Sequence, residues 1–198
     1  MTQEVLMQFT RSKQVWMLLS WQLLALSAVA QTAQTSGSES LPPVATITKL
    51  DVPRYMGTWH EIAKFPNRFQ AKCVTNTRAR YLAQTDGSVQ VLNSCITADG
   101  STIDALGLAK QVGPATSPKL QVRFAPAWLS WLPMVWGDYW VIDLDADYQL
   151  AAVSDAKREY LWVLSRTPRV SPTAYNALLT RLRAQAFDVQ RLETTPQP

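Results

Sequence analysis

The chain has 198 residues and a mass of 22.2 kDa, a size typical of one domain. Hydrophobic residues make up 47% and charged residues 17%, which excludes both a disordered chain and a polytopic membrane protein. The net charge is +4, but the basic residues are scattered, so we expect no nucleic-acid partner. One histidine and two cysteines are too few for a His/Cys zinc site, and we expect neither a metal nor a cofactor.

Residues 1–30 have the organisation of a secretory signal peptide. A basic cluster at Arg11 and Lys13 precedes the mainly apolar residues 15–26, and Ala28-Val29-Ala30 fits the small-x-small pattern of a cleavage site. The apolar stretch is shorter than the ~20 residues of a membrane span, with an uncleaved anchor as the alternative. We expect an exported protein, periplasmic or associated with the outer membrane, and soluble after cleavage because no cysteine is present there for lipid attachment. Residues 31–43 are polar and predict a flexible lead-in.

Eight extended segments come next in the chain, separated by turn residues such as Asp86-Gly87 and Asp99-Gly100. Short links between strands favour an antiparallel meander, and eight strands can close into a barrel without free edges around one small ligand. The predicted fold is therefore an all-β, eight-stranded antiparallel up-and-down β-barrel within residues 44–193. Its strands are expected at residues 58–64, 75–83, 88–96, 103–112, 120–124, 139–144, 150–154 and 160–166.

A helix is predicted after the last strand. Ser171 is a good N-cap and Pro172 suits the first helical turn. Tyr175, Leu178 and Leu182 recur at helical spacing, so one face is apolar. We expect one C-terminal α-helix packed outside the barrel, followed by a loose tail at residues 194–198.

Cys73 and Cys95 are predicted to form a disulfide, because export leads to an oxidising compartment. The loop they close would stabilise the fold by ~3 kcal/mol in the chain-entropy model. The Asp86-Gly87 turn does not place the two residues opposite each other, so a bulge or a skewed strand end is required. Two free thiols are the alternative.

Three motifs resemble the lipocalin family. Gly57-Thr58-Trp59 stands at the first strand, Asp145-Ala146-Asp147-Tyr148 forms a looser match after the sixth, and residues 160–168 match the last strand with Arg166. The segment 64–70 is similar to the branch of bacterial outer-membrane lipocalins and apolipoprotein D. The resemblance covers about residues 50–192 and implies a barrel closed at one end. It also implies that Gly57, Trp59 and Arg166 are structural, with Trp59 stacked on Arg166 at the closed end.

Strand alternation and the resemblance together indicate which side chains line the interior. Trp162 and Leu164 on the last strand, and Tyr139 and Val141 on the sixth, are predicted to contact a ligand, although Trp162 could also be ordinary barrel packing. Arg78 and Arg80 share one face of the second strand. If that face is the interior, they are candidate headgroup ligands or partners that neutralise Asp143 and Glu61, and if it is the outer face they are simply solvated.

Strand alternation also predicts that two carboxylates point into the barrel. Asp143 shares the inward parity of Tyr139, and Glu61 shares that of Trp59, so each would need a buried partner. His60, the only histidine, should point away from the interior. We therefore predict no catalytic residue.

The segment 127–136 is rich in tryptophan and joins the fifth and sixth strands. Counting hairpins places Trp128, Trp131 and Trp136 at the open rim of the barrel. Exposed indoles there favour contact with a membrane interface. The alternative is a loop folded over the mouth as packing.

The sequence favours a non-enzymatic carrier of a hydrophobic small molecule, a fatty acid or a lysophospholipid. The alternatives are a binder of tetrapyrroles or other pigments, a membrane-docking factor of envelope maintenance, and an enzyme with a pocket cysteine or carboxylate. A homodimer is left open.

Overall fold

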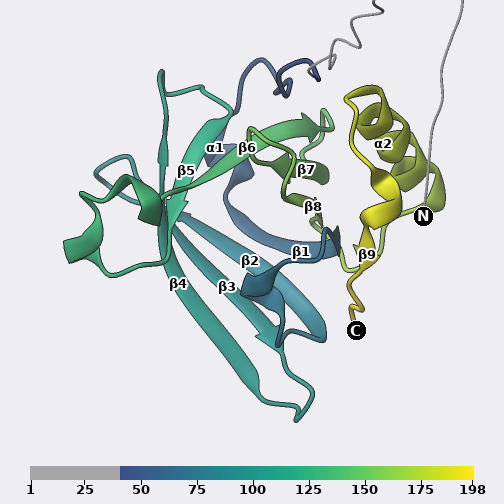
Figure 1. Cartoon of the computed structure of the whole chain (residues 1–198), viewed down its shortest axis with the longest axis horizontal. Helices are drawn as coiled ribbons and strands as arrows, with labels where there is room; N and C mark the ends of the chain where they lie inside the picture. Colours follow the sequence, from purple (N-terminus) through teal and green to yellow (C-terminus); the bar gives the residue numbers. More distant parts are fainter. Residues whose placement is uncertain (1–40) are drawn as a thin grey trace, which may run out of the picture. The chain divides into compact units, whose positions relative to one another are not determined.

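Eight antiparallel strands close into a barrel in the computed structural model, which describes residues 41–198 (Figure 1). Each strand pairs with the next along the chain, and the first also pairs with the eighth. The predicted fold class is confirmed, and the strand ends differ from expectation by at most two residues. The strands are β1 (Gly57–Lys64), β2 (Thr75–Ala83), β3 (Val89–Ile96), β4 (Thr102–Gln111), β5 (Lys119–Arg123), β6 (Gly137–Leu144), β7 (Leu150–Ser154) and β8 (Leu161–Ser165).

The signal peptide and most of the lead-in were predicted for residues 1–40, which lie outside the described residues. The chain contacts the barrel domain from Pro42 on, whose carbonyl accepts a hydrogen bond of 2.8 Å from Arg158 Nη2. The short helix α1 (Val52–Tyr55) comes next, with Asp51 Oδ1 accepting from the Arg54 amide at its N-cap. Its four residues are too few for a periodic pattern, so the sequence did not predict it.

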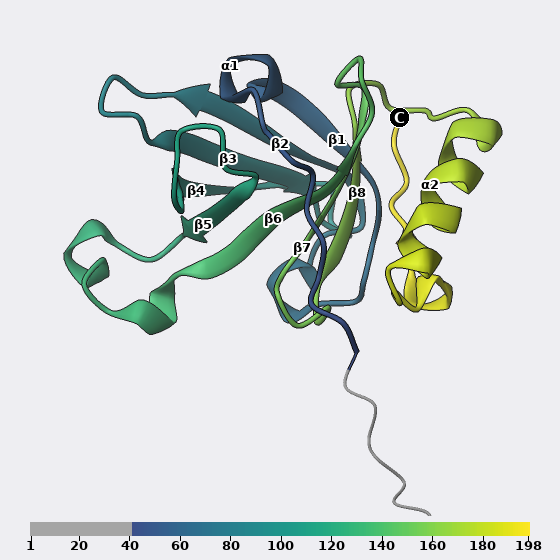
Figure 2. The same cartoon turned by 90° about the horizontal axis from the view of Figure 1, so that it is seen from above.

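Helix α2 (Pro172–Ala184) packs outside the barrel, as predicted (Figure 2). The Ser171 hydroxyl caps it by accepting a hydrogen bond of 3.2 Å from the Ala174 amide. Leu178 and Leu182 are fully buried in a cluster with outward-facing residues of the strands, among them Ile142 and Val163. No helix within residues 41–198 has the length and apolar character needed to cross a membrane.

A β-bulge corrects the expected position of Asp143. The β6–β7 register shifts between Val141 and Asp143, so the alternation of inward and outward side chains changes there. Asp143 therefore lies on the outer side, where Arg181 of α2 donates two hydrogen bonds to it, at 2.6 and 2.9 Å. The carboxylate joins the helix to the barrel, and it does not line the interior as its sequence parity predicted.

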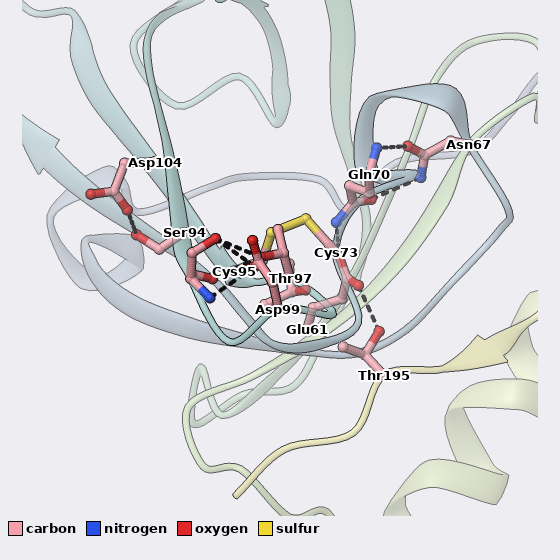
Figure 3. The surroundings of a disulfide bond; sticks show 12 residues. Glu61, Asn67, Gln70, Cys73, Ser94, Cys95, Thr97, Asp99, Asp104 and Thr195 are labelled. Carbon is pink, nitrogen blue, oxygen red and sulfur yellow. Dashed lines mark hydrogen bonds between the residues drawn. A yellow bond between two sulfur atoms is a disulfide. The ribbon is translucent and has the colours of Figure 1, made fainter.

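The predicted disulfide between Cys73 and Cys95 is present (Figure 3). The required irregularity is present too, as a shift in the β2–β3 register between Thr75 and Arg78. Asn76, at the shift, has a φ of 54°. This bulge allows Cys73 to reach a cysteine that is not directly opposite it in the ladder.

The C-terminal tail is ordered, and the expectation of a loose tail is wrong. The pairing of β1 with β2 ends at the pair His60 and Arg78, so the parts of the two strands nearer the mouth are not paired with each other. We call this gap between the two strands the seam. Strand β9 (Glu193–Thr194) pairs with β1 beside this seam (Figure 1). Beyond it, the Asn76 amide donates to the Pro196 carbonyl at 2.9 Å. The tail thus completes the barrel wall.

Candidate ligand-binding cavity

The barrel encloses a cavity of about 1250 Å³. This is larger than the roughly 300–1,000 Å³ of common small-molecule sites. Leu50 and residues of α1 close one end, and the loop around Phe69 and the β7–β8 turn surround the other. Most of the wall between them is apolar, with Val89, Val91 and Leu120 among its residues. A long hydrophobic molecule therefore fits this interior.

Trp59 and Arg166 seal the closed end. The Arg166 guanidinium lies 4.0 Å from the centre of the fully buried Trp59 ring, as the resemblance implied. It also donates to the carbonyls of Arg54 and Thr58 at 2.7 and 3.0 Å, which ties α1 to β1. Gly57 has a φ of +95°, and a Cβ there would lie 3.3 Å from Arg166 Nη1. The positive φ favours glycine at this position, and a Cβ would also press on the guanidinium.

Three tyrosine hydroxyls meet inside the cavity, near its closed end. Tyr139 Oη lies 2.9 Å from Tyr55 Oη and 2.9 Å from Tyr81 Oη. Burial raises the pKa of Tyr81 to about 12 and raises the pKa of Tyr55 and of Tyr139 as well. All three phenols are therefore neutral at physiological pH. Only Tyr139 was predicted, although Tyr81 has the inward parity of Ala79 on β2 and could have been found from it.

Glu61 is buried towards the mouth, one inward position beyond Trp59 on β1. Gln70 Nε2 donates to one of its carboxylate oxygens and Thr195 Oγ1 to the other, the latter at 2.6 Å (Figure 3). Desolvation raises the pKa of Glu61 above its usual value, and these two donors oppose the shift. Gln70 Oε1 also accepts from Trp162 Nε1 at 2.9 Å. The buried carboxylate has the partners it required, and its network fixes the indole at the cavity wall.

Of the residues predicted to contact a ligand, some border the cavity and others do not. Trp162, Leu164 and Tyr139 border the cavity, whereas Val141 is fully buried in the barrel core and does not border it. For the arginines of β2 the sequence left both faces open, and the burial pattern of the strand favours the outer one. Arg78 and Arg80 are exposed and alternate with buried residues of the strand, so their side chains lie on the outer face, although Arg78 still borders the cavity.

The β5–β6 loop presents two indoles to solvent. Trp128 and Trp131 are 74% and 75% exposed and do not border the cavity, so they do not cover its mouth. Trp136 is half-buried and does border it. Lys110 Nζ lies 4.2 Å from the centre of the Trp136 ring and Arg123 Cζ 5.3 Å from it. These cations anchor the loop on β4 and β5 while the other two indoles point outwards.

Metal-ligating side chains do not gather in the part of the chain that the structure describes. No group of three or more histidine, cysteine, aspartate or glutamate side chains within residues 41–198 could hold a metal ion. His60 does not border the cavity, as predicted, and its Nδ1 lies 3.4 Å from Gln197 Oε1. The cavity therefore has no imidazole to bind a haem iron.

An eight-stranded antiparallel barrel around a large apolar cavity, with one helix outside, defines a class of proteins that enclose small hydrophobic molecules. A family model described as a lipocalin-like domain matches residues 50–197. The chain belongs to the lipocalin family, which confirms the predicted resemblance.

The chain is 41% identical to temperature-induced lipocalin-1 of Arabidopsis thaliana, over 75% of this chain and 80% of that protein. It is 34% identical to the outer membrane lipoprotein Blc of Escherichia coli K12, over 88% of this chain and 96% of that protein. The solved structure of insecticyanin from the tobacco hornworm Manduca sexta superimposes with a TM-score of 0.60 at 18% identity, covering 79% of this chain and 85% of that one. The last similarity supports the fold alone.

Proposed function

We propose that this protein binds a single-chain lipid, a fatty acid or a lysophospholipid, and carries it within the cell envelope. The observation that carries the proposal is the apolar cavity of about 1250 Å³, closed at one end by α1 and Trp59. The name of the E. coli relative, an outer membrane lipoprotein, supports a place in the envelope. The disulfide supports export, because such bonds persist in oxidising compartments. Binding, and not catalysis, is the activity proposed.

The energetics are consistent with such a ligand. Burial of a chain of about sixteen carbons contributes at most ~12 kcal/mol, at ~0.8 kcal/mol per methylene. A micromolar complex requires ~8 kcal/mol, so apolar burial alone can supply the affinity after modest ordering costs. With Arg78 and Arg80 outside, the headgroup contacts are assigned to the mouth, where Arg68, Lys72 and Lys157 border the cavity. Asp155 and Glu159 border it too, a mixture of charges that suits a zwitterionic headgroup.

Titration of delipidated protein with palmitate and with lysophosphatidylcholine tests the proposal. We expect saturable quenching of tryptophan fluorescence at micromolar ligand, because Trp162 lines the cavity. Trp162→Phe should lose a large part of this quenching, the rest coming from Trp136, which also borders the cavity, whereas Trp128→Phe, at a 74% exposed position, should keep all of it. The absence of quenching by any long-chain amphiphile would contradict the proposed function.

Contact with a membrane surface is a second candidate function, compatible with the first. Trp128, Trp131 and Met134 are 74%, 75% and 84% exposed on one loop beside the mouth. Indole rings favour the lipid–water interface, and such an apolar tip is unusual on a soluble surface. Trp131→Ser should reduce co-sedimentation with liposomes several-fold without changing lipid binding in the cavity. Equal co-sedimentation of both proteins would exclude this role for the loop.

A further inference from the structure

The three tyrosine hydroxyls near the closed end have no role in the proposed function so far. We infer that Tyr55, Tyr81 and Tyr139 form a subsite that donates a hydrogen bond to an uncharged oxygen of the ligand, a carbonyl or a hydroxyl. The inference rests on the proposed binding of a lipid and specifies its chemistry. A lipid that fills this subsite carries such an oxygen at the end of its chain that reaches the closed end, in addition to the headgroup at the mouth.

A count of protons supports a free donor. Each phenol has one O–H, so the cluster has three donors in total. The two contacts of 2.9 Å, from Tyr139 to Tyr55 and to Tyr81, use two of these protons. These hydroxyls make no other hydrogen bond with residues 41–198. One proton is therefore left without a protein acceptor, whichever way the hydroxyls rotate.

This unpaired proton lies in apolar surroundings, where a hydrogen bond to a ligand contributes more to binding than it would in water. All three tyrosines border the cavity, and so do the apolar side chains of Leu50 and Leu120. A donor in apolar surroundings gains more from a partner than one in water, and a ligand that cannot accept leaves it unpaired. Burial keeps the pKa of each phenol above its ordinary value, so the groups donate throughout the physiological range.

The charges around the cavity favour an uncharged oxygen at this end. Arg166 is close enough to oppose the upward pKa shift that burial causes in Tyr55 and in Tyr81, but its guanidinium packs on the Trp59 ring and does not border the cavity, so it makes no contact with a carboxylate there. Arg68, Lys72 and Lys157 border the cavity at its mouth instead. A charged headgroup therefore finds its cations at the mouth, and the tyrosine hydroxyls at the closed end suit an uncharged oxygen.

Two probes of equal chain length, methyl decyl ketone and dodecane, test the inference by displacement of a fluorescent ligand. The comparison protein is the triple variant Tyr55→Phe/Tyr81→Phe/Tyr139→Phe, which keeps every ring and removes every hydroxyl. Single variants are less informative. Without the hydroxyl of Tyr55 or of Tyr81, two protons and one contact remain, so one proton is still free to bind the ligand. We expect the triple variant to weaken ketone binding about 5- to 10-fold relative to dodecane, the range of one hydrogen bond. The ratio between proteins cancels the different solubilities of the probes.

Tyr160→Phe is the matched control, because Tyr160 borders the cavity at the mouth and stacks on Trp162, with ring centres 5.7 Å apart. It should leave the preference unchanged. Infrared spectroscopy of the bound ketone gives a second readout that needs no variant: the carbonyl stretch should move to lower frequency on binding to the wild-type protein. An unshifted carbonyl, or equal effects of the triple variant on both probes, would overturn the inference while palmitate binding still upheld the proposed function. Failure of palmitate and of the two probes to bind would contradict the proposed function as well as the inference.

Discussion

Trp59→Ala should reduce the free energy of unfolding by about 4 kcal/mol, a large part of the roughly 5–15 kcal/mol of a typical domain. The Trp59 side chain is fully buried, and its ring centre lies 4.8 Å from that of Tyr55. Its Nε1 donates to the Tyr55 carbonyl at 2.8 Å. The substitution therefore leaves a cavity, an unpaired carbonyl and an Arg166 guanidinium without the ring on which it packs.

Urea unfolding followed by circular dichroism measures this loss. Trp128→Ala is the matched control, because the same side chain is removed from a position that is 74% exposed, and it should change stability by less than about 0.5 kcal/mol. Trp59→Phe should fall between the two, since a ring is kept and the hydrogen bond of Nε1 is lost. Equal losses for Trp59→Ala and Trp128→Ala would show that the contact with Arg166 does not hold the closed end together.

The barrel could be predicted because its causes are local. Alternating strands, turn residues at regular intervals and a capped amphipathic helix are each visible within a short window of sequence. The same alternation correctly placed Trp162 and Leu164 at the cavity. It failed at Asp143, because a β-bulge adds one residue and reverses the parity of the later residues in the strand. A bulge depends on the partner strand and leaves no reliable mark in one sequence.

The polar parts of the site were less predictable for a related reason. The tyrosine cluster joins residues 58 and 84 positions apart, and nothing in the sequence around Tyr55 indicates that its hydroxyl meets Tyr139. For Arg78 and Arg80 the sequence established that they share a face, but not which one. The pairing of β2 with β1 decided that question, because Ala79 lies opposite the buried Trp59. Contacts between residues so far apart in the sequence are known only once the strands are paired in the closed barrel.

Removal of residues 193–198 should cost about 4 kcal/mol, since several hydrogen bonds at ~0.5–1.5 kcal/mol each are lost together. The tail connects the two strands that their own ladder leaves apart. Gln197 Nε2 donates to the Glu61 carbonyl of β1 at 2.7 Å and to the Thr77 carbonyl of β2 at 2.9 Å. Thr195 also donates to the buried Glu61 carboxylate. Truncation leaves these acceptors unpaired and opens the seam beside the cavity.

Urea unfolding again gives the measurement, with deletion of the exposed Pro198 alone as the control, expected to change stability by less than about 0.5 kcal/mol. Gln197→Ala should cost about 1 kcal/mol, because it removes only the amide that bridges the strands. If the seam limits retention of the lipid, the truncated protein should also release bound palmitate faster than the Pro198 deletion. A truncated protein as stable as that control would show that β1 and β2 close without the tail, and the barrel wall would then consist of eight strands alone.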